Sequence, residues 1–299
     1  MKQFEYAAPT TLDEAIRLLA EMNGRARPMA GGTDVLVQMR AGRLTPDRIV
    51  DVKNVPELNE LRYDASGGLT IGAAVPCYKI YADTAIARAY PGLIDAASIV
   101  GGVAIQGRAT LGGNLCNSSP SADTIPVLIA MGAKVNIRGP RGSRQVPVEQ
   151  FCTAPGRNVL EAGEVVVSIE LPAPPPNSGA HYQRFIPRYE MDIAVVGVGA
   201  GVVLSDDKRT IRSARIALGA VAPTPLFVPE AGQALEGKPA AEESLAAAAE
   251  IARNAARPID DMRGTAAQRK HLVGVLTRRV LAGAIARARG EEVHGAHVH

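Results

Sequence analysis

The chain has 299 residues, of which 46% are hydrophobic and 21% charged, and its formal net charge at pH 7 is +3. This length accommodates two domains with a sizeable core, and the charge is too small to indicate nucleic-acid binding. No apolar run approaches the roughly 20 residues that cross a bilayer, and the N-terminus lacks the apolar core of a signal peptide, so we expect a cytoplasmic protein. Three isolated cysteines exclude a disulfide framework and a four-cysteine cluster.

The first half of the chain alternates predicted helices and strands. A capping box, Thr11-x-x-Glu14, opens the first helix, and Thr33 or Asp34 is expected to cap the second. Asp123 is expected to cap a later helix. The elements expected are, in order, helix Leu12–Met22, strand Arg27–Ala30, helix Val35–Arg40, strand Arg48–Val52, strand Leu69–Ala74, a helical stretch Cys77–Val100 broken near Pro91-Gly92, a helix through Val127–Met131, strand Lys134–Arg138, a loop Phe151–Leu160 and strand Val165–Leu171.

A proline-rich segment, Pro172–Gly179, is the clearest boundary, because proline cannot donate a ladder hydrogen bond and favours an extended connector. Strands and then helices follow it, which is typical of an α+β fold. We therefore expect a domain over 1–176 with subdomains of about 1–55 and 56–176, a smaller domain over 177–290 and a flexible tail over 291–299. The elements expected after the boundary are strands His181–Pro187, Ala194–Leu204 and Ile211–Val221, then helices Pro229–Leu235, Glu242–Ala256 and Ala266–Arg289.

Two glycine pairs are the most informative motifs of the chain. Gly31-Gly32 is followed by Thr33, and Gly112-Gly113 by Asn114, and each pair precedes or opens a segment that looks helical. Such a turn exposes backbone N–H groups with no Cβ in the way, so two of them together can hold a diphosphate. Neither turn carries a Lys or Arg as a phosphate hook. Because glycine pairs are also common in tight turns, a purely structural role is the alternative.

Other candidate motifs favour structure over chemistry. Gly197-x-Gly199-x-Gly201 lacks the glycine spacing and following helix of a dinucleotide fingerprint, so we interpret it as a site of close packing. The histidines form no catalytic set, and the serines lack a nucleophile motif with a nearby histidine. We therefore predict no catalytic residue and no metal site on this chain.

Several motifs together resemble the FAD-binding medium subunit of molybdenum hydroxylases, the xanthine dehydrogenase and carbon monoxide dehydrogenase family. The resemblance covers nearly the whole chain. The motifs are Phe4-Glu5-Tyr6, Ala30–Asp34, Thr110–Leu115 with Ser119–Asp123, Tyr182–Phe185, Asp192–Ala194 and Pro258–Asp261 with Arg263.

This resemblance implies a two-part FAD-binding domain of the vanillyl-alcohol oxidase (PCMH) type, followed by a smaller α+β domain with a three-stranded sheet and helices. Arg184 falls where relatives often carry Lys, close to the flavin. No histidine lies near either glycine loop, so FAD is expected to be noncovalent. The residues expected to bind it are Pro28, Met29, Ala30, Gly31, Gly32, Thr33, Asp34, Val35, Val100, Thr110, Leu111, Gly112, Gly113, Asn114, Asp123, Val166 and Arg184.

The same resemblance implies an electron-transfer role. Electrons are expected to pass from a molybdenum centre on a large subunit, through [2Fe-2S] clusters on a small subunit, to FAD on this chain and then to a terminal acceptor. In relatives with one function per polypeptide the assembly is a dimer of heterotrimers. Carbon monoxide dehydrogenases usually have Gly-Gly-His-Ser in the first motif, so Gly-Gly-Thr-Asp here favours an N-heterocycle, aromatic or aldehyde substrate. The scattered cysteines argue against the extra Fe–S loop of hydroxybenzoyl-CoA reductases.

Two other functions are kept as alternatives. One is a free-standing FAD-dependent reductase of the same superfamily, which would need its own substrate pocket and a proton donor at the flavin. The other is a nonenzymatic assembly module whose glycine turns are structural. If FAD binds as expected, Arg184→Ala should leave folding intact and change flavin occupancy or reoxidation.

Overall fold

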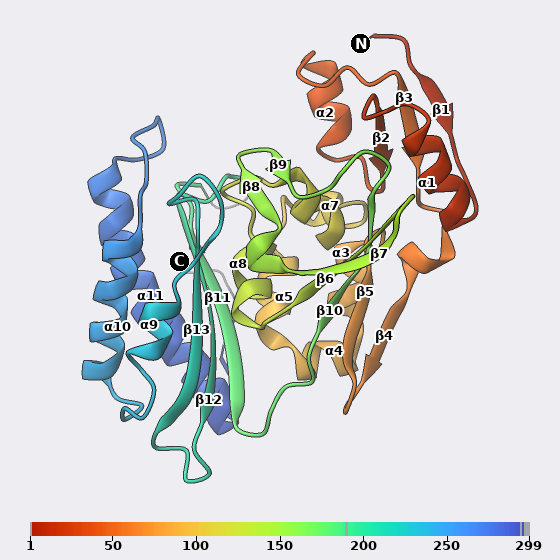
Figure 1. The fold of residues 1–299 in the computed structure, drawn as a ribbon. Coiled ribbons are helices and arrows are strands. Elements are labelled where there is room, and N and C mark those ends of the chain that lie inside the picture. Colours follow the sequence, from red (N-terminus) through yellow and green to blue (C-terminus); the bar gives the residue numbers. More distant parts are fainter. Residues whose placement is uncertain (1, 189–190, 294, 296–299) are drawn as a thin grey trace.

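The computed structural model describes residues 2–188, 191–293 and 295, and these form an α+β fold of three main sheets with their helices (Figure 1). The first sheet is parallel, in the order β1-β3-β2, and two helices belong to the same part of the chain. Its elements are β1 (Glu5–Ala7), α1 (Leu12–Ala20), β2 (Ala26–Met29), α2 (Val35–Arg40) and β3 (Arg48–Asp51).

A five-stranded antiparallel sheet, in the order β4-β5-β10-β6-β7, carries the middle of the chain. Six α-helices and a small hairpin accompany it. The elements are η1 (Pro56–Asn59), β4 (Leu61–Asp64), β5 (Gly68–Gly72), α3 (Cys77–Ala82), α4 (Thr84–Ala89), α5 (Pro91–Ala97), α6 (Val103–Gln106), α7 (Leu111–Asn117), α8 (Thr124–Ala130), β6 (Lys134–Gly139), β7 (Gly142–Pro147), η2 (Val148–Gln150), β8 (Cys152–Ala154), β9 (Arg157–Asn158) and β10 (Val165–Leu171).

The third sheet is antiparallel, in the order β11-β12-β13-β14, with its own helices on one face (Figure 1). On the other face it meets α8 and, at its edge, α5. Its elements are β11 (Ser178–Phe185), β12 (Val196–Leu204), β13 (Ile211–Gly219), β14 (Leu226–Phe227), α9 (Pro229–Gln233), α10 (Glu242–Ala255) and α11 (Ala266–Arg289).

Several sequence predictions of these elements are confirmed. The helices over 35–40 and 266–289 and the strand over 165–171 have the predicted bounds. The Thr11 hydroxyl accepts a hydrogen bond from the Glu14 N–H at 3.3 Å, as the capping box requires. The glycines of β12 provide close packing: a Cβ on Gly199 would lie 2.7 Å from backbone atoms of Pro126 and Val127 in α8.

Other predictions of local structure are wrong. The helical stretch after Cys77 breaks a second time at Asp83, whose carboxylate caps α4 by accepting the Ala85 and Ile86 N–H groups. The expected loop over 151–160 contains the hairpin β8–β9. The strands β4 and β7 were not predicted, and neither contains a fully buried residue. The expected flexible tail includes residues 294 and 296–299, which lie outside the described residues.

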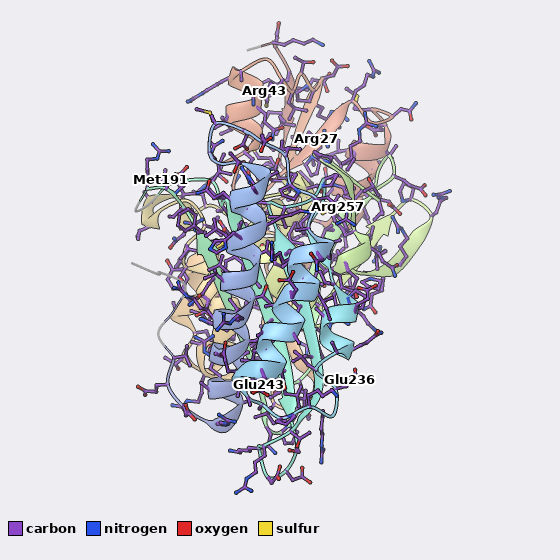
Figure 2. All side chains as sticks on the ribbon, turned by 90° about the vertical axis from the view of Figure 1, so that its left-hand side faces the viewer. Arg27, Arg43, Met191, Glu236, Glu243 and Arg257 are labelled. Carbon is purple, nitrogen blue, oxygen red and sulfur yellow. The ribbon has the colours of Figure 1, made fainter. Side chains whose placement is uncertain are left out.

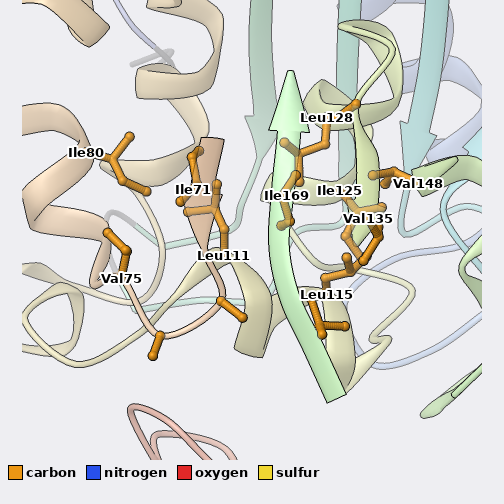
Figure 3. Packing of buried hydrophobic residues seen from close by; sticks show 14 of the residues in the cluster. Ile71, Val75, Ile80, Leu111, Leu115, Ile125, Leu128, Val135, Val148 and Ile169 are labelled. Atoms are coloured by element: carbon orange, nitrogen blue, oxygen red, sulfur yellow. The ribbon is translucent and has the colours of Figure 1, made fainter. Parts of the chain in front are cut away.

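The core of the middle sheet holds the second glycine segment in place (Figure 3). Leu111 and Leu115 of α7 are fully buried and lie beside side chains of β5, β10 and β6. A separate buried cluster lies between β12, β13 and helices α9–α11. Burial of this kind contributes roughly 25 cal/mol per Å² of apolar surface, so α7 is held mainly by its leucines.

Polar groups rather than another strand close the free edge of β11. The Asp95 carboxylate of α5 accepts the Tyr182 N–H at 3.2 Å, and Arg287 of α11 donates to the Ala180 carbonyl at 2.8 Å. Asp95 also pairs with both terminal nitrogens of Arg287, at 2.6 and 2.9 Å, and with His181 Nδ1 at 2.7 Å. These interactions are buried and join α5, β11 and α11.

We predict that Asp95→Ala lowers the free energy of unfolding by about 3–5 kcal/mol, because it leaves the buried Arg287 charge without its partner. Urea denaturation of the full chain measures this loss. Asp13→Ala is the matched control, since Asp13 pairs with Arg138 at 3.1 Å while its side chain is 82% exposed. Equal stability of Asp95→Ala and the parent chain would show that the edge cluster contributes nothing to folding.

Candidate cofactor site

A cavity of about 440 Å³ lies where the first sheet meets α7 and the start of β10. Its volume falls in the range of cofactor sites, roughly 300–1,000 Å³. Thirteen of the seventeen residues expected to bind FAD line it: Pro28, Ala30, Gly31, Gly32, Thr33, Asp34, Val35, Val100, Thr110, Gly112, Gly113, Asn114 and Val166.

The two glycine segments contact each other at this cavity. A Cβ on Gly31 would lie 1.8 Å from the carbonyl oxygen of Arg108, in the segment leading to the second pair. Gly32 has φ +77°, a conformation that side chains rarely adopt. The first turn is therefore both in close contact with the second segment and dependent on glycine.

The second pair lies inside a helix, in the first turn of α7, and not in a loop before one. Thr110 is the N-cap, and its hydroxyl accepts the Gly113 N–H at 2.8 Å. A Cβ on Gly112 would lie 2.6 Å from the Ala73 carbonyl oxygen, so glycine lets α7 approach the end of β5. The Asn114 side chain accepts the Thr124 hydroxyl at 2.7 Å through its oxygen. Its amide NH₂ has no hydrogen-bond partner among the described residues.

Other cavity residues were not predicted from the sequence. Gln38 of α2 donates to Asn117 of α7 at 2.8 Å, a contact across 79 residues that joins the two parts of the site. Asn158 of β9 donates to the Cys116 carbonyl at 2.9 Å. Arg27 of β2 also lines the cavity. Gln38 lies one helical turn after Asp34, and this spacing is the only feature of the sequence that would place Gln38 on the same side of α2 as the first glycine pair.

Four expected residues do not line the cavity: Met29, Leu111, Asp123 and Arg184. Leu111 belongs to the core. Asp123 and Arg184 form a buried ion pair at 2.5 Å, and the Tyr182 hydroxyl donates to Asp123 at 2.9 Å. The prediction that the Asp123 side chain caps α8 is wrong, because both of its oxygens are engaged by β11. Asp34 precedes α2, and its side chain also makes no capping bond.

Burial raises the pKa of Asp123 to about 6, while the Arg184 guanidinium and the Tyr182 hydroxyl act to lower it. The carboxylate is therefore mostly ionised at neutral pH, and the pair is close to neutral overall. Burial raises the pKa of Asp34, inside the cavity. Burial likewise raises the pKa of the Cys116 thiol to about 12. That thiol is protonated at neutral pH.

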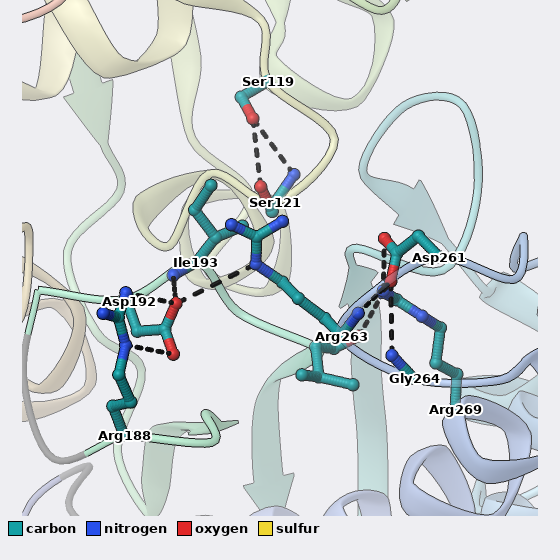
Figure 4. A network of polar contacts seen from close by, with 10 residues as sticks. Ser119, Ser121, Arg188, Asp192, Ile193, Asp261, Arg263, Gly264 and Arg269 are labelled. Carbon is teal, nitrogen blue, oxygen red and sulfur yellow. Dashed lines mark hydrogen bonds and ion pairs between the residues drawn. The ribbon is translucent and has the colours of Figure 1, made fainter.

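The motif segments around Asp192 and Asp261, far apart in the sequence, meet beside the start of β12 (Figure 4). Asp192 pairs with Arg188 at 3.3 Å and with Arg263 at 3.9 Å. One terminal nitrogen of Arg269 donates to both carboxylate oxygens of Asp261, at 2.7 Å each. The other terminal nitrogen donates to the Val195 carbonyl at 2.8 Å. These bonds attach the segment before β12 to the N-terminal end of α11.

Within residues 2–188, 191–293 and 295, no three His, Cys, Asp or Glu side chains are grouped so that they could hold a metal ion. None of the helices in that part of the chain is long and apolar enough to cross a membrane.

The buried ion pair changes the expectation for Arg184→Ala. Removing the guanidinium leaves the Asp123 carboxylate buried without a counter-charge, so we predict a loss of about 3–5 kcal/mol in the free energy of unfolding. The double variant Asp123→Asn/Arg184→Ala should lose less than the two single changes added together. Denaturant titration of the three variants measures the coupling, and strictly additive losses would rule out the pairing.

The chain matches known proteins over nearly its full length. A model described as "FAD binding domain in molybdopterin dehydrogenase" matches residues 2–174, and one described as "CO dehydrogenase flavoprotein C-terminal domain" matches residues 181–284. The chain is 35% identical to the xanthine dehydrogenase FAD-binding subunit of Escherichia coli O157:H7, over 96% of this chain and 97% of that one. It is 32% identical to the carbon monoxide dehydrogenase medium chain of Hydrogenophaga pseudoflava, over 95% and 98%.

A solved structure agrees with these similarities. Quinoline 2-oxidoreductase from Pseudomonas putida 86 contains a chain that superimposes with a TM-score of 0.88 at 32% identity, covering 96% of this chain and 99% of that one. With both parts of the chain matched, a flavoprotein with a FAD-binding domain and a smaller α+β domain is established. The chain belongs to the FAD-binding subunit family of the molybdenum hydroxylases, the oxidoreductases that include xanthine and carbon monoxide dehydrogenases.

Proposed function

We propose that this chain is the electron-transfer subunit of a molybdenum hydroxylase, holding FAD noncovalently in the cavity between its glycine segments. Gly31 lies against the backbone at Arg108, just before α7, and both glycine pairs line one cavity; this carries the proposal. A diphosphate fits such a place, because backbone N–H groups approach it with no Cβ between. Bound FAD supplies the capacity to accept electrons singly or in pairs and to deliver a pair.

The chain's own residues would bind and orient the cofactor. The first turn and Thr33 would hold the diphosphate, and the Asn114 amide would donate a hydrogen bond from the second segment. Val166 would contact the cofactor from β10. Arg184 and Asp123 form a nearly neutral buried pair beside Thr124, whose hydroxyl donates to Asn114. Because neither member of the pair lines the cavity, we propose that they act on the flavin through their electric field and not by direct contact.

Electrons are proposed to arrive from [2Fe-2S] clusters on a small subunit, after substrate oxidation at the molybdenum cofactor of a large one. We propose a dimer of heterotrimers in the cytoplasm. Thr33-Asp34 in place of His-Ser supports an N-heterocycle, aromatic or aldehyde substrate over carbon monoxide.

The proposed division of labour within the chain follows the boundary at the proline-rich segment. Residues 1–176 would bind FAD, with subdomains of about 1–55 and 56–176, and residues 177–290 would form the smaller domain. Two separate buried clusters support this division, one around the middle sheet and one under α9–α11.

We expect the complex purified from its native host to show flavin and Fe–S absorbance and to contain two further chains. Anaerobic addition of quinoline, an aromatic aldehyde or carbon monoxide, each separately, should bleach the flavin band with one of the first two and not with the third. A yellow single chain that works alone would indicate a free-standing reductase. A colourless chain that stays colourless with FAD would contradict the proposal.

Gly31→Ala should strongly reduce FAD retention, because its Cβ would lie 1.8 Å from the Arg108 carbonyl oxygen and force the two segments apart. The measurement is the ratio of flavin to protein after gel filtration. Gly107→Ala is the matched control: it is near the same segment, has φ −67°, and its Cβ would meet no atom within 4 Å. Normal flavin content in Gly31→Ala would contradict the two-segment site.

A further inference from the structure

Acidic side chains outnumber basic ones on the wall of the cavity. Arg27 is the only Lys or Arg among the lining residues, which include three acidic residues. Glu164 pairs with Arg144 at 2.7 Å, and Glu161 pairs with Arg141. Asp34 has no basic partner among the described residues. Arg27 is thus the one cationic side chain of the cavity wall.

Arg27 also stands apart from the arginines near it. Arg25 pairs with Asp47 at 2.9 Å, and Arg48 pairs with Glu5 at 2.8 Å and with Glu21 at 2.9 Å. For Arg27 the described residues provide no carboxylate and no hydrogen-bond acceptor. An arginine left unpaired where the arginines near it are paired is available to an anionic ligand.

Arg27 lines the same cavity as the two glycine pairs. β2 is the edge strand of the first sheet, and Arg27 lies four residues before Gly31. The positive charge of Arg27 acts to lower the pKa of the Cys116 thiol, in the helix that begins with the second pair. Arg27 and Cys116 both line the cavity. Arg27 is therefore a residue of the cavity wall, four residues before the first glycine pair.

We propose that Arg27 is the phosphate-binding side chain of this site and pairs with the diphosphate of FAD. This inference rests on the proposed function. The glycine pairs themselves offer neutral N–H donors, and the Arg108 guanidinium beside them donates to the Gly31 carbonyl at 3.4 Å and does not line the cavity. The nearby Asp34 carboxylate would repel a diphosphate. A guanidinium matches two phosphate oxygens with its fork of N–H groups and offsets that repulsion. The basic phosphate-binding residue that both glycine motifs lack is thus supplied by Arg27 of β2.

The test compares FAD with riboflavin, which lacks the diphosphate and the adenosine. FAD and riboflavin are titrated separately into the deflavinated full complex, and quenching of flavin fluorescence gives each dissociation constant. The variants are Arg27→Ala and Arg27→Lys. Arg43→Ala is the matched control, because Arg43 is exposed, lies in the same subdomain and does not line the cavity. Figure 2 labels Arg27 and Arg43 on this part of the molecule.

Arg27→Ala should weaken FAD binding by roughly 10- to 100-fold, the range for a hydrogen bond to a charged group. Riboflavin binding should change little. The FAD affinity of Arg27→Lys should lie between those of Arg27→Ala and the parent, because lysine keeps the charge and loses the paired N–H donors of the guanidinium. Since Arg27 is exposed, the FAD affinity of the parent should fall with added salt more steeply than that of Arg27→Ala. Arg43→Ala should match the parent throughout.

Two results would overturn the inference while leaving the proposed function intact. One is unchanged FAD affinity in Arg27→Ala. The other is an equal loss for FAD and riboflavin, which would place Arg27 against the flavin ring. A parent complex that binds no FAD would overturn the proposed function and this inference with it. Thermal unfolding of the deflavinated variants, expected to match the parent, shows that the altered affinity is not a folding defect.

Discussion

The site depends on the close approach of two backbone segments, Gly31 and the chain at Arg108. A Cβ at Gly31 would lie 1.8 Å from the carbonyl oxygen of Arg108, so no other residue fits without separating the first sheet from the helix α7. The hydrogen bond between Gln38 and Asn117 spans the same junction. The cavity is the space that this contact leaves, and its shape depends on both segments staying in place.

Buried charges hold the smaller domain against the rest of the molecule. Asp95 and Asp123 come from the helical part of the FAD-binding half, and both bind β11. Each carboxylate has an arginine partner, Arg287 or Arg184, so neither charge is buried alone. Such pairs contribute little net stability but are costly to break, so they favour one relative arrangement of the parts. Through the second pair, β11 also holds Asp123 next to Thr124, whose hydroxyl donates to Asn114 of the second glycine segment.

Residues that make up the site differ in how far the sequence could predict them. Thirteen of the seventeen residues that the family resemblance implied line one cavity, and most of them belong to the two glycine motifs that carry the resemblance. Gln38 and Asn117 could not be predicted, since their contact joins helices 79 residues apart. Arg27 precedes the first motif and is one of many arginines. Only its missing partner and its place on the cavity wall distinguish it.

Local patterns in the sequence determined the capped first helix, the long last helix, the strand over 165–171 and the α+β order, because periodicity and capping act within a few residues. The tertiary structure decided the rest. It placed Gly112 and Gly113 inside α7, drew the Asp123 carboxylate away from a capping role to Tyr182 and Arg184, and closed the β11 edge with Asp95 and Arg287. These outcomes depend on which residues, distant in the sequence, are buried next to one another, and a pattern that spans only a few residues cannot predict that.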